Sequence, residues 1–203
     1  MRSDLSTAKR RVPQQERGER RVAALLEAAA AVIVEVGYDA ATMTGMAERA
    51  EASIGAMYQY FPNKEAVVRA LRSQYGAEME ERWKPLAAES ATLSIEQLVD
   101  RIFEVLVEFM ESRPAYIPLL SAPVTYSRDP EARNRLREHF AKLFREKRPE
   151  LSPEQAFRVA NVTLQMVKGL NPIYADAKPK ERRELLQEFK LAVTAYLRAR
   201  LGA

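Results

Sequence analysis

Apolar residues recur every three or four positions along most of this chain, and this spacing constrains its fold more than any other feature. The first such segment starts near Glu16, and similar segments follow it to the end of the sequence. The 11 prolines fall between these segments, and only seven glycines occur in 203 residues. No window alternates apolar and polar residues for long enough to predict a strand. We therefore expect an all-α protein with about nine helices.

The ends of the first helices are marked by residues that favour caps. Gly37 ends the segment that starts near Glu16, and it suits the left-handed conformation of a C-cap. Thr42 and Ser53 have side chains preferred at N-caps, so they predict two helices of about two turns each, joined by a tight turn at Glu51. Helices this short cannot bury an apolar core by themselves. We expect both to pack against the first helix.

Capping residues and prolines also delimit the later helices. The sequence S-I-E-Q at 94–97 is a capping box, and Pro130 and Pro153 follow residues that favour N-caps. Pro85 and Pro172 are expected to end or bend the helices before them, because proline disrupts a helix interior. Together these signals predict helices at approximately 63–83, 95–113, 130–147, 153–170 and 179–201, and a short bent helix within 114–126.

Positive charge is concentrated at the start of the chain. Residues 1–21 contain seven Lys or Arg and three Asp or Glu, so they account for the whole net charge of +4. A basic end on a neutral body is typical of an arm that binds a polyanion, most simply nucleic acid, although a solvated terminus has the same pattern. We expect residues 1–15 to form a flexible arm whose Lys9, Arg10 and Arg11 contact DNA.

Several kinds of site are not expected, because the residues they need are missing. There is no cysteine, and the single histidine, His139, lies among charged residues and is expected to be solvated. We therefore predict no metal site, no cofactor and no catalytic residues, since phosphate loops and hydrolase motifs are missing as well. No apolar run reaches the roughly 18–20 residues of a membrane span, and the first residues lack the apolar core of a secretory signal. The expected location is the cytoplasm.

Residues 37–65 contain a dense set of matches to a known DNA-binding motif. They include Gly37-Tyr38 at the end of the first helix, Thr42 at the next cap, Met46-Ala47, and the segment S-I-G-A-M-Y-Q-Y-F-P-N-K-E from Ser53 to Glu65. On these residues the chain resembles the helix-turn-helix of the TetR family of bacterial transcriptional regulators. Three positions differ from the family's commonest residues, because Glu51 replaces a turn glycine, Ile54 a lysine and Tyr60 a histidine.

The resemblance implies which residues contact DNA. Small residues let a recognition helix approach the floor of the major groove, and Gly55 and Ala56 meet this need. By correspondence, the residues expected near base edges are Thr44, Ile54, Gly55 and Tyr58, with Gln59 as a further candidate. The residues expected to contact phosphates are Thr42, Ser53, Tyr60 and Lys64. Met57 and Phe61 should face the core, and packing is the alternative role for Tyr58 and Tyr60.

The resemblance also divides the chain into the arm, a DNA-binding domain at 16–62, and a helical domain at 63–203 that binds a ligand and forms a homodimer. The dimer interface is expected on the last two helices, at Ala160, Thr163, Val167, Phe189, Val193 and Tyr196, and for some of these residues the alternative is packing inside one protomer. The pocket is expected at Phe103, Leu106, Met110, Tyr116, Tyr126, Phe140, Phe144 and Met166. Ordinary packing in the core is the alternative for each pocket residue. No buried charge stands out, which favours an apolar or aromatic ligand.

The implied function is that of a ligand-responsive regulator of the bacterial nucleoid, most commonly a repressor. It binds a palindromic operator as a dimer, with half-sites about 34 Å apart, and leaves it when a small molecule changes the spacing of the two DNA-reading heads. The alternative from the residues alone is a helical adaptor or membrane-surface protein without sequence-specific DNA binding. The last helix has acidic as well as basic residues on its polar side, which is not typical of a lipid-binding face.

Overall fold

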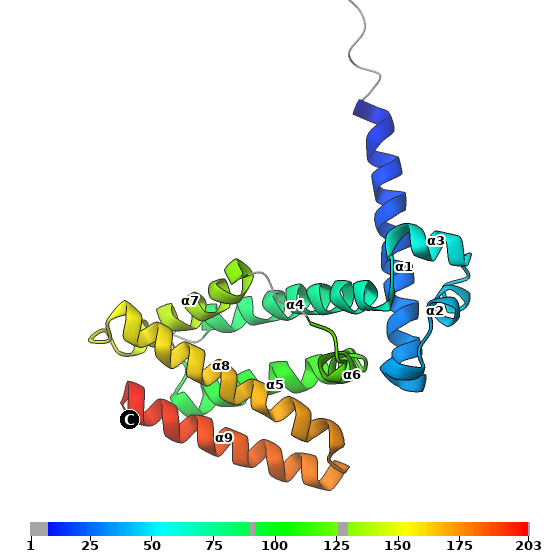
Figure 1. Cartoon of the computed structure of the whole chain (residues 1–203). Helices are drawn as coiled ribbons and strands as arrows, with labels where there is room; N and C mark the ends of the chain where they lie inside the picture. Colours follow the sequence, from blue (N-terminus) through cyan, green and yellow to red (C-terminus); the bar gives the residue numbers. More distant parts are fainter. Residues whose placement is uncertain (1–7, 90–91, 126–129, 203) are drawn as a thin grey trace, which may run out of the picture. The chain divides into compact units, whose positions relative to one another are not determined.

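The computed structural model describes residues 8–89, 92–125 and 130–202. Over these ranges it contains nine α-helices and no strand, which confirms the all-α fold that the apolar spacing predicted (Figure 1). The helices form two compact units. One contains the chain up to Arg72 together with residues 118–124, and the other contains residues 73–117 and the chain from Thr125 onward. No helix in the described ranges is long and apolar enough to cross a membrane.

The first unit is built on α1 (Ala8–Ala40), and α2 (Met43–Arg49) contacts both α1 and α3 (Ile54–Tyr60). Its core includes fully buried side chains from all three helices, Leu25, Met46 and Met57. The two short helices therefore bury their apolar faces within this unit, as their length required. α4 (Lys64–Glu89) begins in the same unit and continues into the second.

α1 begins earlier and ends differently than the sequence indicated. Residues 8–15, which we expected in a flexible arm, are helical, so Lys9, Arg10 and Arg11 belong to the first turns of α1. Gly37 interrupts the helix at the expected cap, with φ 77° and ψ 167°. This positive φ is as predicted, but the ψ value lies outside the left-handed helical region, in a conformation open essentially only to glycine.

Residues 118–124 belong to the first unit, although the sequence assigned them to the second domain. They comprise the end of α6 (Tyr116–Ser121) and the loop after it. Arg72 holds them, because its Nε donates to the carbonyl of Leu119 (2.7 Å) and its Nη atoms donate to the carbonyls of Ala122 (2.8 Å) and Val124. A single guanidinium thus binds carbonyls that the end of a short helix leaves without intrahelical partners.

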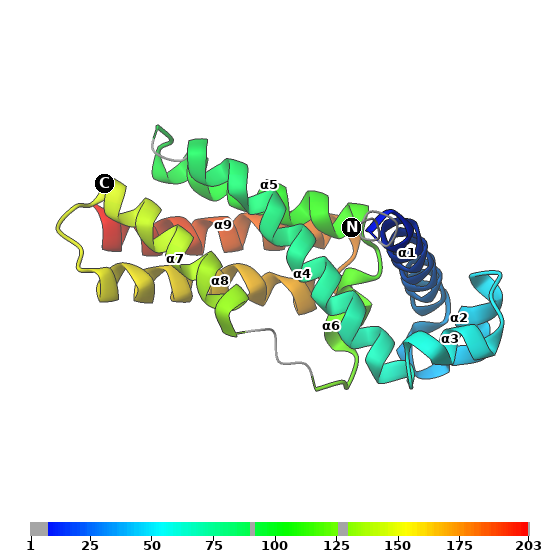
Figure 2. The ribbon, with the colours of Figure 1, turned by 90° about the horizontal axis from the view of Figure 1, so that it is seen from above.

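The second unit contains the rest of α4, α5 (Ile95–Ser112), α7 (Pro130–Lys147), α8 (Pro153–Asp176) and α9 (Pro179–Leu201). α8 contacts α7 and α9, and α9 also contacts α5; Figure 1 shows α8 between its two neighbours, and Figure 2 shows α5 along α9. The largest fully buried side chains of this unit are Phe103, Phe109, Phe140 and Phe144. Aromatic packing therefore forms much of its core.

The capping box at Ser94 occurs as predicted and a second capping box begins α8 at Ser152, but two helices pass through prolines. Ser94 Oγ accepts from the amide of Gln97 (3.2 Å), and Ser152 begins α8 in the same way. α4 continues through Pro85 to Glu89, and α8 continues through Pro172 to Asp176. Proline removes one helical hydrogen bond, and at Pro85 the burial of the next residue offsets part of that loss. Leu86, directly after the first of these prolines, is buried.

Candidate nucleic-acid interface

The two short helices of the first unit have capped N-termini. Thr42 Oγ1 accepts from the amide of Gly45 at 3.1 Å, and Ser53 Oγ accepts from the amide of Ala56 at 3.2 Å. Both N-caps are therefore as predicted. Each cap residue is exposed, and each hydroxyl keeps its own O–H as a donor, which is the group that a phosphate oxygen accepts from.

The turn between α2 and α3 is closed by backbone hydrogen bonds that place Glu51 in an unusual conformation. The amide of Ala52 donates to the carbonyl of Ala47 (2.9 Å), and the amide of Glu51 donates to that of Glu48 (3.0 Å). This is the Schellman pattern, in which the residue after the C-cap has a positive φ and is usually glycine. Glu51 has φ 50°, and no other non-glycine residue of the described ranges has a positive φ. Glu51, which replaces the family's glycine, therefore preserves the turn but places a residue with a Cβ in a strained backbone conformation.

α3 presents opposite faces to the core and to solvent. Met57 is fully buried and Phe61, its C-cap, is buried as well, so both face inward as predicted. The other side exposes Ile54, Gly55, Tyr58, Gln59 and Tyr60, while Ala56 is half-buried. On α2, Thr44 is exposed. Every residue expected to read base edges is therefore accessible, and α3 itself carries no charged side chain.

Lys64 has a structural role that the sequence did not reveal. Its ammonium donates to the carbonyls of Tyr38 (2.7 Å) and Asp39 (3.1 Å) and lies 4.3 Å from the centroid of the Tyr38 ring. The start of α4 is thereby joined to the end of α1, where Gly37 interrupts the helix and leaves carbonyls available. The helix end at Gly37 could be predicted from the sequence. The lysine that binds the carbonyls after it could not, because it lies about 25 residues further along the chain.

The residues expected to form the ligand pocket fall into separate groups. Phe103, Leu106, Met110, Phe140 and Phe144 are buried, Tyr116 and Met166 are half-buried, and Tyr126 lies outside the described residues. Phe140 packs against Phe144 and Trp83, with ring centroids 6.0 and 5.6 Å apart. Tyr116 instead meets Phe109 edge to face at 5.0 Å. The sequence did not nominate Phe109 or Trp83 for the pocket.

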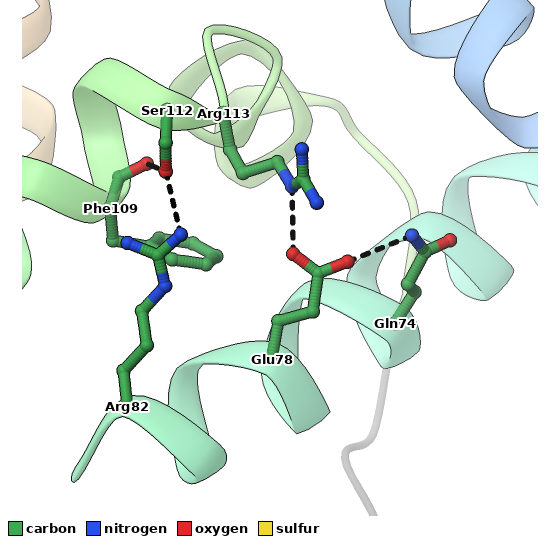
Figure 3. A network of polar contacts seen from close by, with 6 residues as sticks. All are labelled: Gln74, Glu78, Arg82, Phe109, Ser112 and Arg113. Atoms are coloured by element: carbon green, nitrogen blue, oxygen red, sulfur yellow. Dashed lines mark hydrogen bonds and ion pairs between the residues drawn. The ribbon is translucent and has the colours of Figure 1, made fainter.

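Around Phe109 lies a polar network that joins α4 to α5 (Figure 3). Arg113 Nε donates to a carboxylate oxygen of Glu78 (2.7 Å), whose other oxygen accepts from Gln74 (2.9 Å). Arg82 donates to the hydroxyl of Ser112 (3.0 Å), and its guanidinium lies 5.1 Å from the centroid of the Phe109 ring. The charges beside this aromatic ring are therefore hydrogen-bonded.

Four of the residues expected at the dimer interface, Ala160, Thr163, Val167 and Val193, are buried in the single chain. The dimer interface stays a prediction. Phe189 and Tyr196 are half-buried, and the Phe189 ring lies close to Gly169 in α8 of the same protomer, where an added Cβ would be 3.5 Å from the ring. The large apolar side chains of α8 and α9 that are exposed, among the described residues, are Val162, Ile173 and Leu191.

His139 is exposed, as its charged neighbours predicted. Within the described ranges, no three His, Asp or Glu side chains gather closely enough to hold a metal ion.

Two family models match the chain. The model described as "Bacterial regulatory proteins, tetR family" matches residues 25–71, which include α2 and α3. The model described as "Tetracyclin repressor-like, C-terminal domain" matches residues 94–197, from the cap of α5 into α9.

A curated relative and two solved structures agree with these matches. The HTH-type transcriptional repressor KstR of Mycolicibacterium smegmatis is 40% identical over 67 residues, which is 33% of this chain and 29% of that protein. A TetR-family transcriptional regulator from Pectobacterium atrosepticum has a TM-score of 0.72 at 23% identity, covering 93% of this chain and 97% of the other. A TetR variant from Acinetobacter baumannii, solved in complex with minocycline, has a TM-score of 0.61 at 18% identity, covering 88% and 96%.

The match to KstR spans less than a third of that relative's length, and the structural likenesses, at these identities, show the fold. The C-terminal family model alone covers half of the chain, and the N-terminal model covers the helix-turn-helix. The chain therefore belongs to the TetR family of bacterial regulatory proteins.

Proposed function

We propose that this chain is a ligand-responsive transcriptional repressor that binds a palindromic operator as a homodimer and is released by a small molecule. The observation on which the proposal rests is the division of α3 into a buried face and an exposed face. Its buried Met57 anchors the helix, and its opposite side offers Ile54, Gly55 and Tyr58 to solvent. A capped, uncharged helix with a small leading face is what close approach to base edges requires.

The contacts to DNA follow from this arrangement. Ile54 and Tyr58 are one helical turn apart on the exposed side of α3, and Gly55 beside them leaves room for the edge of a base pair. Thr44, Ala56 and Gln59 lie at the border of the same surface. The exposed hydroxyls of Thr42, Ser53 and Tyr60 donate to phosphates and fix the register on the duplex. Lys64 contributes through its third N–H while it holds the end of α1.

The basic start of α1 supplies the electrostatic part of the affinity. α3 has no charge of its own, and Lys9, Arg10 and Arg11 lie in consecutive positions of a helix rather than in an irregular arm. A helical segment of this charge binds the phosphate backbone of DNA beside the site that α3 reads. Its contribution should fall steeply as salt is added, because each neutralised phosphate releases counterions.

Dimerisation uses the solvent side of α8 and α9. On α8, Val162, Gly169 and Ile173 follow one another at helical spacing and are exposed. On α9, Leu191 and Ala195 form a second exposed apolar row. Two copies of these rows bury apolar surface in an isologous interface, in which the same patch of each protomer faces its partner. Phe189 and Tyr196, at the edge of the rows, complete it.

The ligand binds among the aromatic side chains of the second unit. KstR is named a repressor, and the TetR variant from Acinetobacter baumannii was solved with minocycline. The pocket residues proposed from the sequence are mostly buried here and uncharged, so the compound that binds is apolar or aromatic. The regulator works in the cytoplasm, on the nucleoid.

Selection of binding sites from a random DNA pool by the purified protein tests the proposal. The selected DNA should contain a palindrome, and its affinity should then be measured by fluorescence anisotropy. Tyr58→Ala should weaken binding at least tenfold. Val36→Ala, a change at an equally exposed side chain on α1, should not. A pool without a common palindrome, or equal affinities of the two variants, would contradict specific recognition by α3.

A further inference from the structure

A buried side-chain amide in the second unit has an oxygen without a hydrogen-bond partner among the described residues. Asn171, on α8, is only 4% exposed. Its Nδ2 donates to the hydroxyl of Tyr116 at 3.4 Å, and its Oδ1 is buried without a hydrogen-bond partner among the residues that the structure describes. Exchanging the oxygen and nitrogen of the amide would move this deficit to the other end and would not remove it.

This deficit is unusual for a buried polar group. Buried polar side chains are nearly always hydrogen-bonded, since leaving one unpaired costs folding free energy. Thr163, the other buried polar residue of the second unit, follows this rule because its hydroxyl donates to the carbonyl of Val159 at 2.9 Å. The unpaired Oδ1 of Asn171 therefore indicates that a molecule other than this chain donates a hydrogen bond to it.

The surroundings of Asn171 restrict what that partner is. Tyr116, which binds one end of the amide, packs edge to face on Phe109, and Phe109 packs edge to face on Tyr75 with centroids 6.0 Å apart. The amide therefore lies at one end of an aromatic cluster contributed by α4, α5 and α6. Among the charged groups beside this cluster, Glu78 and Arg113 are paired with each other, and Arg82 is hydrogen-bonded to Ser112 (Figure 3).

We propose that Asn171 is the polar contact of the ligand site, and that its Oδ1 accepts a hydrogen bond from the hydroxyl or N–H of a neutral, mainly apolar ligand lying against Tyr116 and Phe109. This inference rests on the proposed role of the second unit as the ligand sensor. We expect the ligand group at Asn171 to be neutral, since a charged group would lose its hydration beside an amide that carries no charge. The ligand class is thus narrowed from apolar or aromatic to apolar with one neutral donor.

A matched pair of probes tests the donor. The compounds 1-naphthol and 1-methoxynaphthalene share an aromatic frame, but only 1-naphthol donates a hydrogen bond. Titration calorimetry with the full chain should show that 1-naphthol binds at least fivefold more tightly. Equal affinities, or binding of neither probe at millimolar concentration, would overturn the proposal.

Two variants of α8 locate the effect. Asn171→Leu keeps the branched shape and the number of non-hydrogen side-chain atoms but has no acceptor, so the preference for 1-naphthol should fall below twofold. Thr163→Val, a buried polar deletion on the same helix whose hydroxyl bonds only within that helix, should keep the preference. Loss of the preference in Thr163→Val as well, or its retention in Asn171→Leu, would show that the donor is read elsewhere.

The thermal stability of the ligand-free protein distinguishes a ligand-binding Asn171 from one that only stabilises the fold. Because its amide is under-bonded, Asn171→Leu should raise the thermal unfolding midpoint of the apo protein. A fall in the midpoint would mean that the amide stabilises the fold and would overturn the proposal. DNA binding is measured separately by anisotropy. A protein that prefers 1-naphthol but binds no operator would contradict the proposed function as a regulator. A protein that binds its operator but shows no preference for 1-naphthol would contradict only the proposed role of Asn171.

Discussion

The guanidinium of Arg113, at the end of α5, lies 2.7 Å from the carboxylate of Glu78 in α4, and Gln74 binds the same carboxylate from one turn earlier (Figure 3). Burial by itself raises the pKa of Glu78, but the hydrogen bonds from Arg113 and Gln74 outweigh it, so the pKa lies below its ordinary value. A carboxylate with a depressed pKa stabilises the fold above its unfolded pKa of about 4.3, and this contribution is lost as the pH falls through the folded value.

Glu78→Gln should therefore reduce the free energy of unfolding by about 1 kcal/mol at pH 7 and by progressively less toward pH 3. Urea unfolding followed by circular dichroism over this pH range measures both values. Glu81→Gln, which alters a more exposed ion pair on the same helix, should have little effect at either pH. A deficit for Glu78→Gln that stays constant with pH would mean that the charge of the carboxylate is not what stabilises it.

Glycine in place of Glu51 should stabilise the protein. A left-handed conformation costs a residue with a Cβ roughly 1–2 kcal/mol, and glycine avoids this cost. Glycine also gives the unfolded chain more freedom, which reduces the gain, so the free energy of unfolding should rise by about 0.5–1 kcal/mol. Thermal unfolding measures it. Ala52→Gly, at the next position of the same turn, should destabilise instead, because Ala52 does not have a positive φ.

Gly55→Ala separates folding from DNA recognition. A Cβ at this position would meet only Ser53 Oγ, at 4.0 Å, so the helix accepts it and gains up to about 1 kcal/mol in propensity. The same methyl group protrudes toward the base edges, and operator affinity should fall at least tenfold. An anisotropy titration that shows unchanged affinity would place Gly55 away from the DNA.

Removing the ammonium of Lys64 should destabilise the first unit. Hydrogen bonds from a charged donor contribute about 1.5–3 kcal/mol, and Lys64 makes two of them to the end of α1, so Lys64→Met should cost about 2 kcal/mol. Lys180→Met, at a solvent-exposed ion pair on α9, should cost less than about 1 kcal/mol. If both variants unfold at the same midpoint, the contacts of Lys64 contribute little. Any loss of operator affinity in Lys64→Met should be judged after correcting for its stability.

Ile173→Glu should weaken the dimer, because it places a charge in the apolar row proposed to face a second copy. Sedimentation velocity should show at least a tenfold rise in the dissociation constant. Leu120→Glu changes a side chain of similar exposure, 45% against 47%, that lies on α6 outside that row. The two variants sedimenting alike would place the interface elsewhere.

The helices of this protein could be predicted because their signals are local. Thr42, Ser53, Ser94 and Ser152 cap the helices that they were expected to cap, since a cap depends on a few neighbouring residues. The predicted end of the helix before Pro85 was wrong, because whether a helix continues through a proline depends on what the next turn packs against. That information is not local in the sequence.

Side-chain roles were harder to predict, for a related reason. Helical spacing placed Val167 and Val193 on apolar faces but could not say whether those faces meet the protomer's own core or a partner, and they meet the core. The carbonyls that Lys64 binds are 25 and 26 residues away in the chain. Asn171 was passed over because a single amide before a proline has no distinctive pattern, and only its burial makes it notable.

The hold of Arg72 on residues 118–124 has a practical meaning for anyone who builds hybrid regulators. Joining the DNA-binding head of one protein to the sensor of another within α4, after Arg72, would leave Arg72 facing a foreign loop, whose carbonyls are not placed to accept from its five N–H groups. A functional exchange should carry residues 118–124 along with the head as a second, separate graft. In this chain the head is encoded in two pieces.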